Sequence, residues 1–204
     1  MPKKNPADAG RGQGSGFVVC LPARDYDRDS LTAPVPQSLA SRRLAVRFSG
    51  ESETLYAPAL VADAALRDEL YRNHTVRLVL DRARRADMAL VGIGDLSEDS
   101  NMVRMGWFSP QEVAEARLSG TIGDIMGYDF IDIHGRPSSA NMQGRVIGLT
   151  TRDLARIPDV VAIASENTKA AAILGALRTG VINTLATSST NARTVLRLDE
   201  ATRP

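Results

Sequence analysis

The sequence predicts an α/β fold in which a mostly parallel sheet is flanked by helices. Short apolar runs alternate with helical patterns along most of the chain, and the segments between them are only a few residues long. The run MALVGI (88–93) is nearly continuous in apolar residues, as expected for a central parallel strand covered on both faces. Strands that alternate with helices in this way are typical of a parallel sheet.

The first half of the chain is expected to contain fewer strands than helices. Its elements are a strand at FVVCL (17–21), a helix over 37–48, a short strand at 53–56, and helices over 64–71 and 76–85. Asp63 and Thr75 stand directly before the last two helices and can cap them.

The second half holds the most apolar strands. Its elements are the strand 88–93, a helix from Pro110 to Leu118, extended segments over 121–126, 128–133 and 145–149, a short helix over 151–156, a strand over 159–164, a helix over 168–178, a strand over 181–187, and a closing helix to about 198. Gly180 ends the helix 168–178, and Ser189 or Thr190 caps the closing helix.

Composition excludes several classes of protein. The 204 residues carry a net charge of +1, which supplies no general field for binding nucleic acid. Cys20 is the one cysteine, so an internal disulfide and a cysteine-based zinc site are excluded. No apolar run approaches the ~20 residues of a membrane helix, and no apolar stretch follows the basic start as in a signal peptide. We therefore expect a cytoplasmic protein without metal or cofactor.

The chain is expected to form one domain after a disordered tail. Residues 1–16 contain four glycines, two prolines and no large apolar side chain except Met1, so they cannot bury enough surface to become ordered. The domain then spans residues 17–204, a length that supports a single core.

Three polar segments directly follow predicted strands: VGIGD (91–95), AIASENTK (162–169) and LATSST (185–190). In an open parallel sheet, ligands bind at the carboxyl ends of the strands. Gly92 and Gly94 could let a ligand approach the backbone, although G-x-G also serves packing. Ser97 replaces the third glycine of G-x-G-x-x-G and no Walker motif occurs, so dinucleotides and nucleoside triphosphates are disfavoured.

Charged candidates lie close to these segments. Lys169 falls in the first turn of its helix, where the helix dipole disfavours a cation, so a bound anion, a sugar hydroxyl or Glu166 should compensate it. Asp124 is either a turn residue or an acceptor for hydroxyl groups. Arg104 could bind a phosphate, whereas Asp132 in DIHG is most simply a turn residue.

The order of several segments resembles the effector domain of SorC/DeoR-type sugar-responsive transcriptional regulators. The segments are TLYAPALV (54–61), ALRDELYRNHTVRLVLDRARRADMALVGIGD (65–95), SGTIGDIMGYDFIDIHGRP (119–137) and the long stretch from RVIGL to ARTVL (145–196). The likeness covers about residues 37–198. It implies a Rossmann-like sheet similar to glucosamine-6-phosphate deaminase and ribose-5-phosphate isomerase, a phosphorylated sugar as effector, and association into a homo-oligomer.

The resemblance also implies the ligand-binding residues. Lys169 matches the family lysine, and Asp124 matches the acidic residue that faces sugar hydroxyls. The other implied positions are Gly92, Gly94, Gln37 and Arg104.

The chain departs from the family pattern at four places. PARDYDRDS (22–30), which is rich in acids, follows FVVCL where the family has a glycine-rich phosphate loop. Glu166 stands in place of a glycine and Ser188 in place of an aspartate. No helix-turn-helix is recognised in the sixteen residues before FVVCL. We therefore expect DNA contact only through a helix-turn-helix that this chain does not carry.

Three interpretations of function remain open at this stage. The first, which the resemblance favours, is a binding module for a sugar phosphate. The second is an isomerase or deaminase on the same fold, which needs a general base such as Asp95 or Asp124. The third is a degenerate domain that only oligomerises. No evident nucleophile and base pair supports catalysis, and no G-x-S-x-G occurs.

Overall fold

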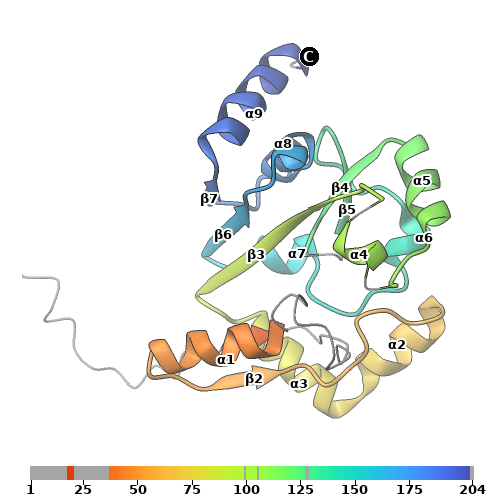
Figure 1. The fold of residues 1–204 in the computed structure, drawn as a ribbon. Coiled ribbons are helices and arrows are strands. Elements are labelled where there is room, and N and C mark those ends of the chain that lie inside the picture. Colours follow the sequence, from red (N-terminus) through yellow and green to blue (C-terminus); the bar gives the residue numbers. More distant parts are fainter. Residues whose placement is uncertain (1–17, 21–36, 99, 105, 127–128, 203–204) are drawn as a thin grey trace, which may run out of the picture.

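The molecule is built around a five-stranded sheet with helices packed on it (Figure 1). The computed structural model describes residues 18–20, 37–98, 100–104, 106–126 and 129–202. The predicted tail, residues 1–16, and the acidic segment 22–30 lie outside these residues. Within them, no helix has the length and apolar character needed to cross a membrane.

The sheet has the strand order β5-β4-β3-β6-β7. Its strands are β3 (Met88–Asp95), β4 (Thr121–Ile125), β5 (Asp129–Asp132), β6 (Asp159–Ala164) and β7 (Thr184–Thr187). β6 runs parallel to both β3 and β7, whereas β4 is antiparallel to both β3 and β5. The α/β architecture is thus confirmed, with a sheet that is parallel in one half and antiparallel in the other.

One face of the central strand is buried and the other is open. Val91 and Ile93 are 3% and 2% exposed, whereas Met88 and Leu90 are 59% and 56% exposed. The prediction that this strand is covered on both faces is therefore wrong. An unbroken apolar run does not reveal which of its two alternating faces finds a packing partner.

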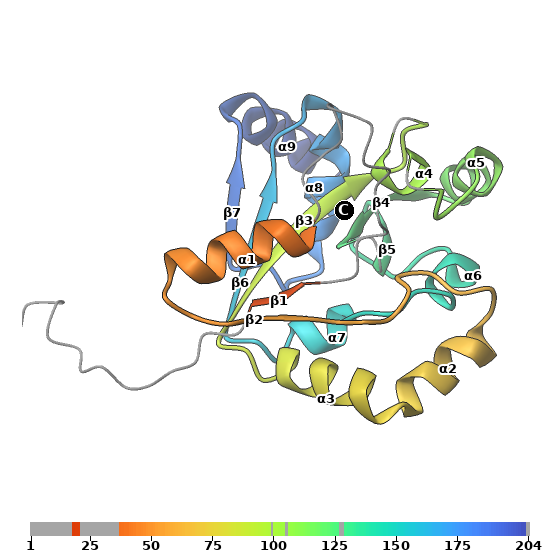
Figure 2. The same cartoon turned by 60° about the horizontal axis from the view of Figure 1, so that its bottom comes forward.

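A second, two-stranded sheet lies apart from the main one. β1 (Val18–Cys20) runs parallel to β2 (Ser52–Thr54), and α1 (Gln37–Arg47) packs on both strands (Figure 2). The strand and helix predictions are confirmed here. The pairing could not be read from the sequence, because β1 is as apolar as a strand of the main sheet.

Two helices in direct succession lead into β3. Asp63 caps α2 (Ala64–Arg72) by accepting a hydrogen bond from the backbone N–H of Leu66 at 2.9 Å, as predicted. The cap of α3 (His74–Ala83) is Asn73, whose Oδ1 accepts from the backbone N–H groups of Thr75 and Val76. The prediction of Thr75 as the cap is wrong, because the helix begins one residue before it.

The remaining helices connect the strands and pack against both faces of the sheet. They are α4 (Asn101–Arg104), α5 (Pro110–Leu118), α6 (Ala140–Gln143), α7 (Thr151–Leu154), the 3-10 turn η2 (Asn167–Lys169), α8 (Ala170–Arg178) and α9 (Ser189–Thr202). α8 packs across β3, β4 and β5, and α9 packs on α8. Gly180 follows α8 with φ 76°, which confirms the predicted C-terminal glycine.

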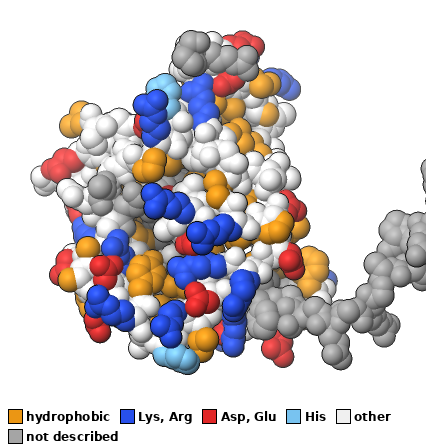
Figure 3. Space-filling model, turned by 180° about the vertical axis from the view of Figure 1, so that it is seen from behind, with side chains coloured by type: hydrophobic (Ala, Val, Ile, Leu, Met, Phe, Trp, Pro, Cys, Tyr) orange, Lys and Arg blue, Asp and Glu red, His pale blue; other side chains and the backbone are white. Residues whose placement is uncertain are grey.

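Charges of both signs are mixed over the surface. On the rear face, Lys and Arg side chains are numerous and acidic side chains lie among them (Figure 3). Arginines in α2, in α3 and directly after α3 pair with carboxylates: Arg72 with Glu69, Arg82 with Glu53, and Arg84 with Asp81 and Asp153. This mixing agrees with the near-zero net charge.

Candidate functional site

The three polar segments that follow β3, β6 and β7 meet at one edge of the sheet. The three strands are parallel neighbours, so their carboxyl ends point the same way (Figure 1). β3 ends at Asp95, η2 and Lys169 follow β6, and β7 ends at Thr187. The convergence predicted from the sequence is thereby confirmed.

Asp95 ties the end of β3 to the turn that carries Lys169. Its carboxylate accepts hydrogen bonds from Thr168 Oγ1 at 2.7 Å and from Ser97 Oγ at 2.8 Å. Burial raises the pKa of Asp95, but these hydrogen bonds and the charge of Lys169 outweigh it and hold the pKa below its usual value. Asp95 is therefore an anion that anchors the turn.

Lys169 is paired with Glu166 in this structure. Its Nζ lies 2.9 Å from Glu166 Oε2, and the lysine side chain is 16% exposed while that of Glu166 is 61% exposed. The hydrogen bond and the positive charge of Lys169 lower the pKa of Glu166. Of the compensating groups expected for Lys169, Glu166 is thus present. Lys169 itself is the last residue of η2 and precedes α8, rather than lying inside the first α-helical turn.

Asp124 and Gly94 face each other across β4 and β3. Asp124 is only 2% exposed, and its carboxylate fills the space where a Cβ at Gly94 would lie. Gly94 therefore makes room for Asp124. By contrast, a Cβ at Gly92 would meet no heavy atom within 4 Å, so the backbone there is open. Asp124 is a buried neighbour of the strand end, which the sequence did not indicate.

Gln37 and Arg104 are less closely tied to this edge. Gln37 begins α1, as predicted for the residue heading that helix, and its side chain is outside the described part of the structure. Arg104 ends α4 with an exposed side chain. Their roles in ligand binding stay predictions. Asp132 is the turn residue expected, since its Oδ1 accepts from the backbone N–H groups of His134 and Arg136.

Sequence reasoning missed three side chains that organise the site. Thr168 reaches Asp95, 73 positions away in the chain. Thr187 Oγ1 donates to the carbonyl oxygen of Ala164, and the buried Asn191 donates to that of Glu166. The hydroxyl-rich segment 185–190 indicated a polar site but not these partners. Ser188 Oγ accepts from the backbone N–H of Asn191, so Ser188 caps α9, and the prediction of Ser189 or Thr190 is wrong by one or two residues.

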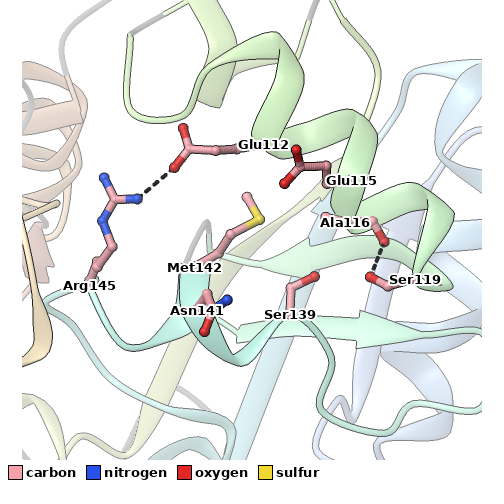
Figure 4. Close-up of a pocket in the computed structure, with 8 residues that line it drawn as sticks. All are labelled: Glu112, Glu115, Ala116, Ser119, Ser139, Asn141, Met142 and Arg145. Atoms are coloured by element: carbon pink, nitrogen blue, oxygen red, sulfur yellow. Dashed lines mark hydrogen bonds and ion pairs between the residues drawn. The ribbon is translucent and has the colours of Figure 1, made fainter.

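A separate hollow of about 360 Å³ lies between α5 and α6 (Figure 4). It is lined by Glu112, Glu115, Ala116, Ser119, Ser139, Asn141, Met142 and Arg145, and contains none of the predicted site residues. Arg145 is paired with Glu112 at 2.6 Å and lies over the ring of Phe108. With its cation neutralised and two carboxylates present, this hollow suits an anion poorly. The strand ends are the better candidate site for an anionic ligand.

A metal centre has no basis in the structure as far as it is described. Among those residues, no three His, Cys, Asp or Glu side chains form a group that could hold a metal ion.

Polar and charged side chains at the carboxyl ends of parallel strands are typical of the ligand sites of α/β proteins. Residues 34–197 match the family described as "Putative sugar-binding domain". The chain belongs to this family, and the resemblance found in the sequence is confirmed.

Relatives of the chain are transcriptional regulators. It is 38% identical over 145 residues to the transcriptional regulator LsrR of Enterobacter sp. (strain 638), covering 70% of this chain and 45% of that protein. The chain thus spans about half the length of the curated relatives that it matches.

Solved structures show the same likeness. A structure described as "Putative Sugar-Binding Domain of Transcriptional Repressor from Vibrio fischeri" is 51% identical, with a TM-score of 0.75 over 81% of this chain and 66% of that one. The full-length sorbitol operon regulator SorC from Klebsiella pneumoniae is 25% identical, with a TM-score of 0.73 over 87% of this chain and 57% of that one. The chain therefore belongs to a family whose solved members include domains of transcriptional regulators.

Proposed function

We propose that this chain is an effector domain that senses a phosphorylated sugar at the edge where β3, β6 and β7 end. The observation that carries the proposal is the position of Lys169 at this edge, where its charge acts on Asp95 and where β3 pairs with the strand that bears Asp124. A cation beside carboxylates suits a ligand with a phosphate at one end and hydroxyl groups at the other, because hydroxyls donate to carboxylates.

The Lys169–Glu166 ion pair supports this function because it can open at little cost. An ion pair with an exposed partner contributes at most about 1 kcal/mol, whereas a charge-assisted hydrogen bond to a phosphate contributes roughly 1.5–3 kcal/mol. A phosphate can therefore displace the Glu166 carboxylate, which is free to turn toward solvent. Glu166 then acts as a stand-in anion in the ligand-free protein.

Binding without turnover fits the chemistry of the site better than catalysis. A general base works best when its pKa lies near the working pH. The hydrogen bonds on Asp95 lower its pKa, which makes this carboxylate a weak base. We therefore propose no isomerase or deaminase activity and no cofactor.

The biological setting is proposed from the relatives. Because they are transcriptional regulators, we propose that sugar binding controls association of this domain with copies of itself in the cytoplasm. DNA contact would then be made by a helix-turn-helix outside the present chain.

A thermal-shift panel tests the proposal. Pentose and hexose phosphates are compared with their unphosphorylated parent sugars, inorganic phosphate and free nucleotides. At least one sugar phosphate should stabilise the protein, by about 2.7 kcal/mol at a hundredfold excess over its dissociation constant, and should be recovered unchanged. If no sugar phosphate stabilises the protein, the result would favour a degenerate domain that only oligomerises. If a parent sugar stabilises it equally, the phosphate group is not needed for binding.

A further inference from the structure

We infer that Asn191 is a positioning residue, which holds the turn bearing Lys169 in the conformation that binds the ligand. The inference rests on the proposed function. Asn191 lies in the first turn of α9 and is 1% exposed. Its amide nitrogen Nδ2 donates to the carbonyl oxygen of Glu166 at 3.0 Å and to Thr187 Oγ1 at 3.3 Å. The side chain thus reaches from the last helix to the segment after β6.

The carbonyl oxygen of Glu166 is shared between Asn191 and Lys169. The backbone N–H of Lys169 donates to the same oxygen at 3.1 Å, and this hydrogen bond closes the 3-10 turn that ends at Lys169. Asn191 therefore fixes the acceptor on which the turn is built. At the end of β7, Thr187 Oγ1 donates to the carbonyl oxygen of Ala164, the last residue of β6, at 2.6 Å. Thr187 therefore links the ends of these two strands.

The amide oxygen of Asn191 shows that packing alone does not explain why an asparagine occupies this position. Its Oδ1 is buried and accepts no hydrogen bond within the part of the chain that the structure describes. A buried acceptor without a partner is unfavourable, and an apolar side chain of similar size would avoid it. A polar residue that is unfavourable for folding and holds a ligand-facing turn is typical of a functional position.

Substitution of Asn191 should weaken ligand binding without an equal loss of stability. In Asn191→Leu, which keeps the branched shape and the number of heavy atoms of the side chain, we expect faster amide hydrogen exchange at residues 165–169 and roughly tenfold weaker sugar-phosphate binding. The melting temperature should change little, because removal of the unpaired oxygen offsets the loss of the two hydrogen bonds from Nδ2. A merely structural role would lower the melting temperature and the affinity together.

Matched variants complete the test. Thr194→Ala removes a hydrogen bond to the carbonyl oxygen of Thr190 one turn further along α9, and should leave exchange at 165–169 and binding unchanged. Thr187→Ser keeps the hydroxyl and should bind like the wild type, whereas Thr187→Val should bind more weakly. Asn191→Ala serves if the leucine variant does not fold.

Three outcomes would overturn one claim or the other. Unchanged exchange at 165–169 in the Asn191 variants overturns the role of Asn191, whether or not a sugar binds. Failure of the wild-type protein to bind any sugar phosphate in calorimetric titration overturns the proposed function. Faster exchange with unchanged affinity would also overturn the inference, since the turn would then not matter for the ligand.

Discussion

The carboxylate of Asp124 occupies the space beside Gly94 in which any larger residue would place its Cβ. An ideal Cβ at Gly94 would overlap Oδ2 of Asp124 and lie 2.9 Å from its Cγ, which is closer than real Cβ contacts allow. The two residues face each other across β3 and β4. Gly94, the second glycine of the G-x-G pattern, therefore leaves room for the acidic side chain of Asp124 at the end of the sheet.

Gly94→Ala should destabilise the protein because the new methyl group and the Asp124 carboxylate cannot share this space. We expect the free energy of unfolding to fall by about 1–3 kcal/mol, as for other overpacked sites. Gly92→Ala is the matched control, since a Cβ there meets nothing within 4 Å, and its free energy of unfolding should stay close to that of the wild type. Urea denaturation measures both, and equal effects of the two substitutions would contradict the close contact.

Asn73→Ala should lower the free energy of unfolding by about 1 kcal/mol, because Asn73 Oδ1 caps α3. Thr75→Ala should have little effect, because Thr75 lies inside the helix with an exposed side chain. Thermal unfolding of the two variants distinguishes the cap seen in the structure from the one that the sequence favoured. A larger loss for Thr75→Ala would show that the helix begins later than Asn73.

The sequence predicted most elements because local patterns mark them. Asp63 and Ser109 stand before their helices and accept hydrogen bonds from them, and Gly180 ends α8 in the left-handed region. Patterns of this kind depend on neighbours in the chain. The exposure of Met88 and Leu90 could not be predicted, because it depends on what packs on a face of the sheet and not on the residues in the strand.

The candidate site was predicted as an edge of the sheet but not as a set of contacts. Parallel strands place their carboxyl ends together, so Asp95 and Lys169 could be expected near each other. The hydroxyl of Thr168 on Asp95 and the amide of Asn191 on the Glu166 carbonyl depend on side-chain orientation between distant segments. Threonine and asparagine also occur commonly in turns, so their presence alone indicates no partner.

Asp153 should contribute stability that is lost in acid. Burial raises its pKa, but hydrogen bonds from Thr150 and the charge of Arg84, whose Nε lies 3.0 Å from Oδ1, outweigh this and lower the pKa in the folded state. A lowered pKa stabilises the folded state above the unfolded pKa of about 3.9, and the effect disappears as the pH falls through the folded value.

Asp153→Asn should therefore reduce the free energy of unfolding at pH 7 by about 1–3 kcal/mol. The difference from the wild type should shrink as the pH falls below about 4, because protonation then removes the same charge from the wild-type side chain. Urea denaturation across this range gives both curves. Parallel curves at all pH values would show that the charge of Asp153 adds nothing to stability.

Lys169→Met should weaken sugar-phosphate binding at least tenfold, because it removes a charge-assisted hydrogen bond of about 1.5–3 kcal/mol while keeping the apolar stem. Stability without ligand should change by less than about 1 kcal/mol, since the ion pair with the largely exposed Glu166 contributes little. Glu166→Gln is the control: it breaks the same pair but frees Lys169, so affinity should hold or increase. Calorimetric titration compares the three proteins. Equal loss in both variants would mean that the intact ion pair, and not the lysine, binds the ligand, and unchanged affinity in Lys169→Met would exclude Lys169 from the site.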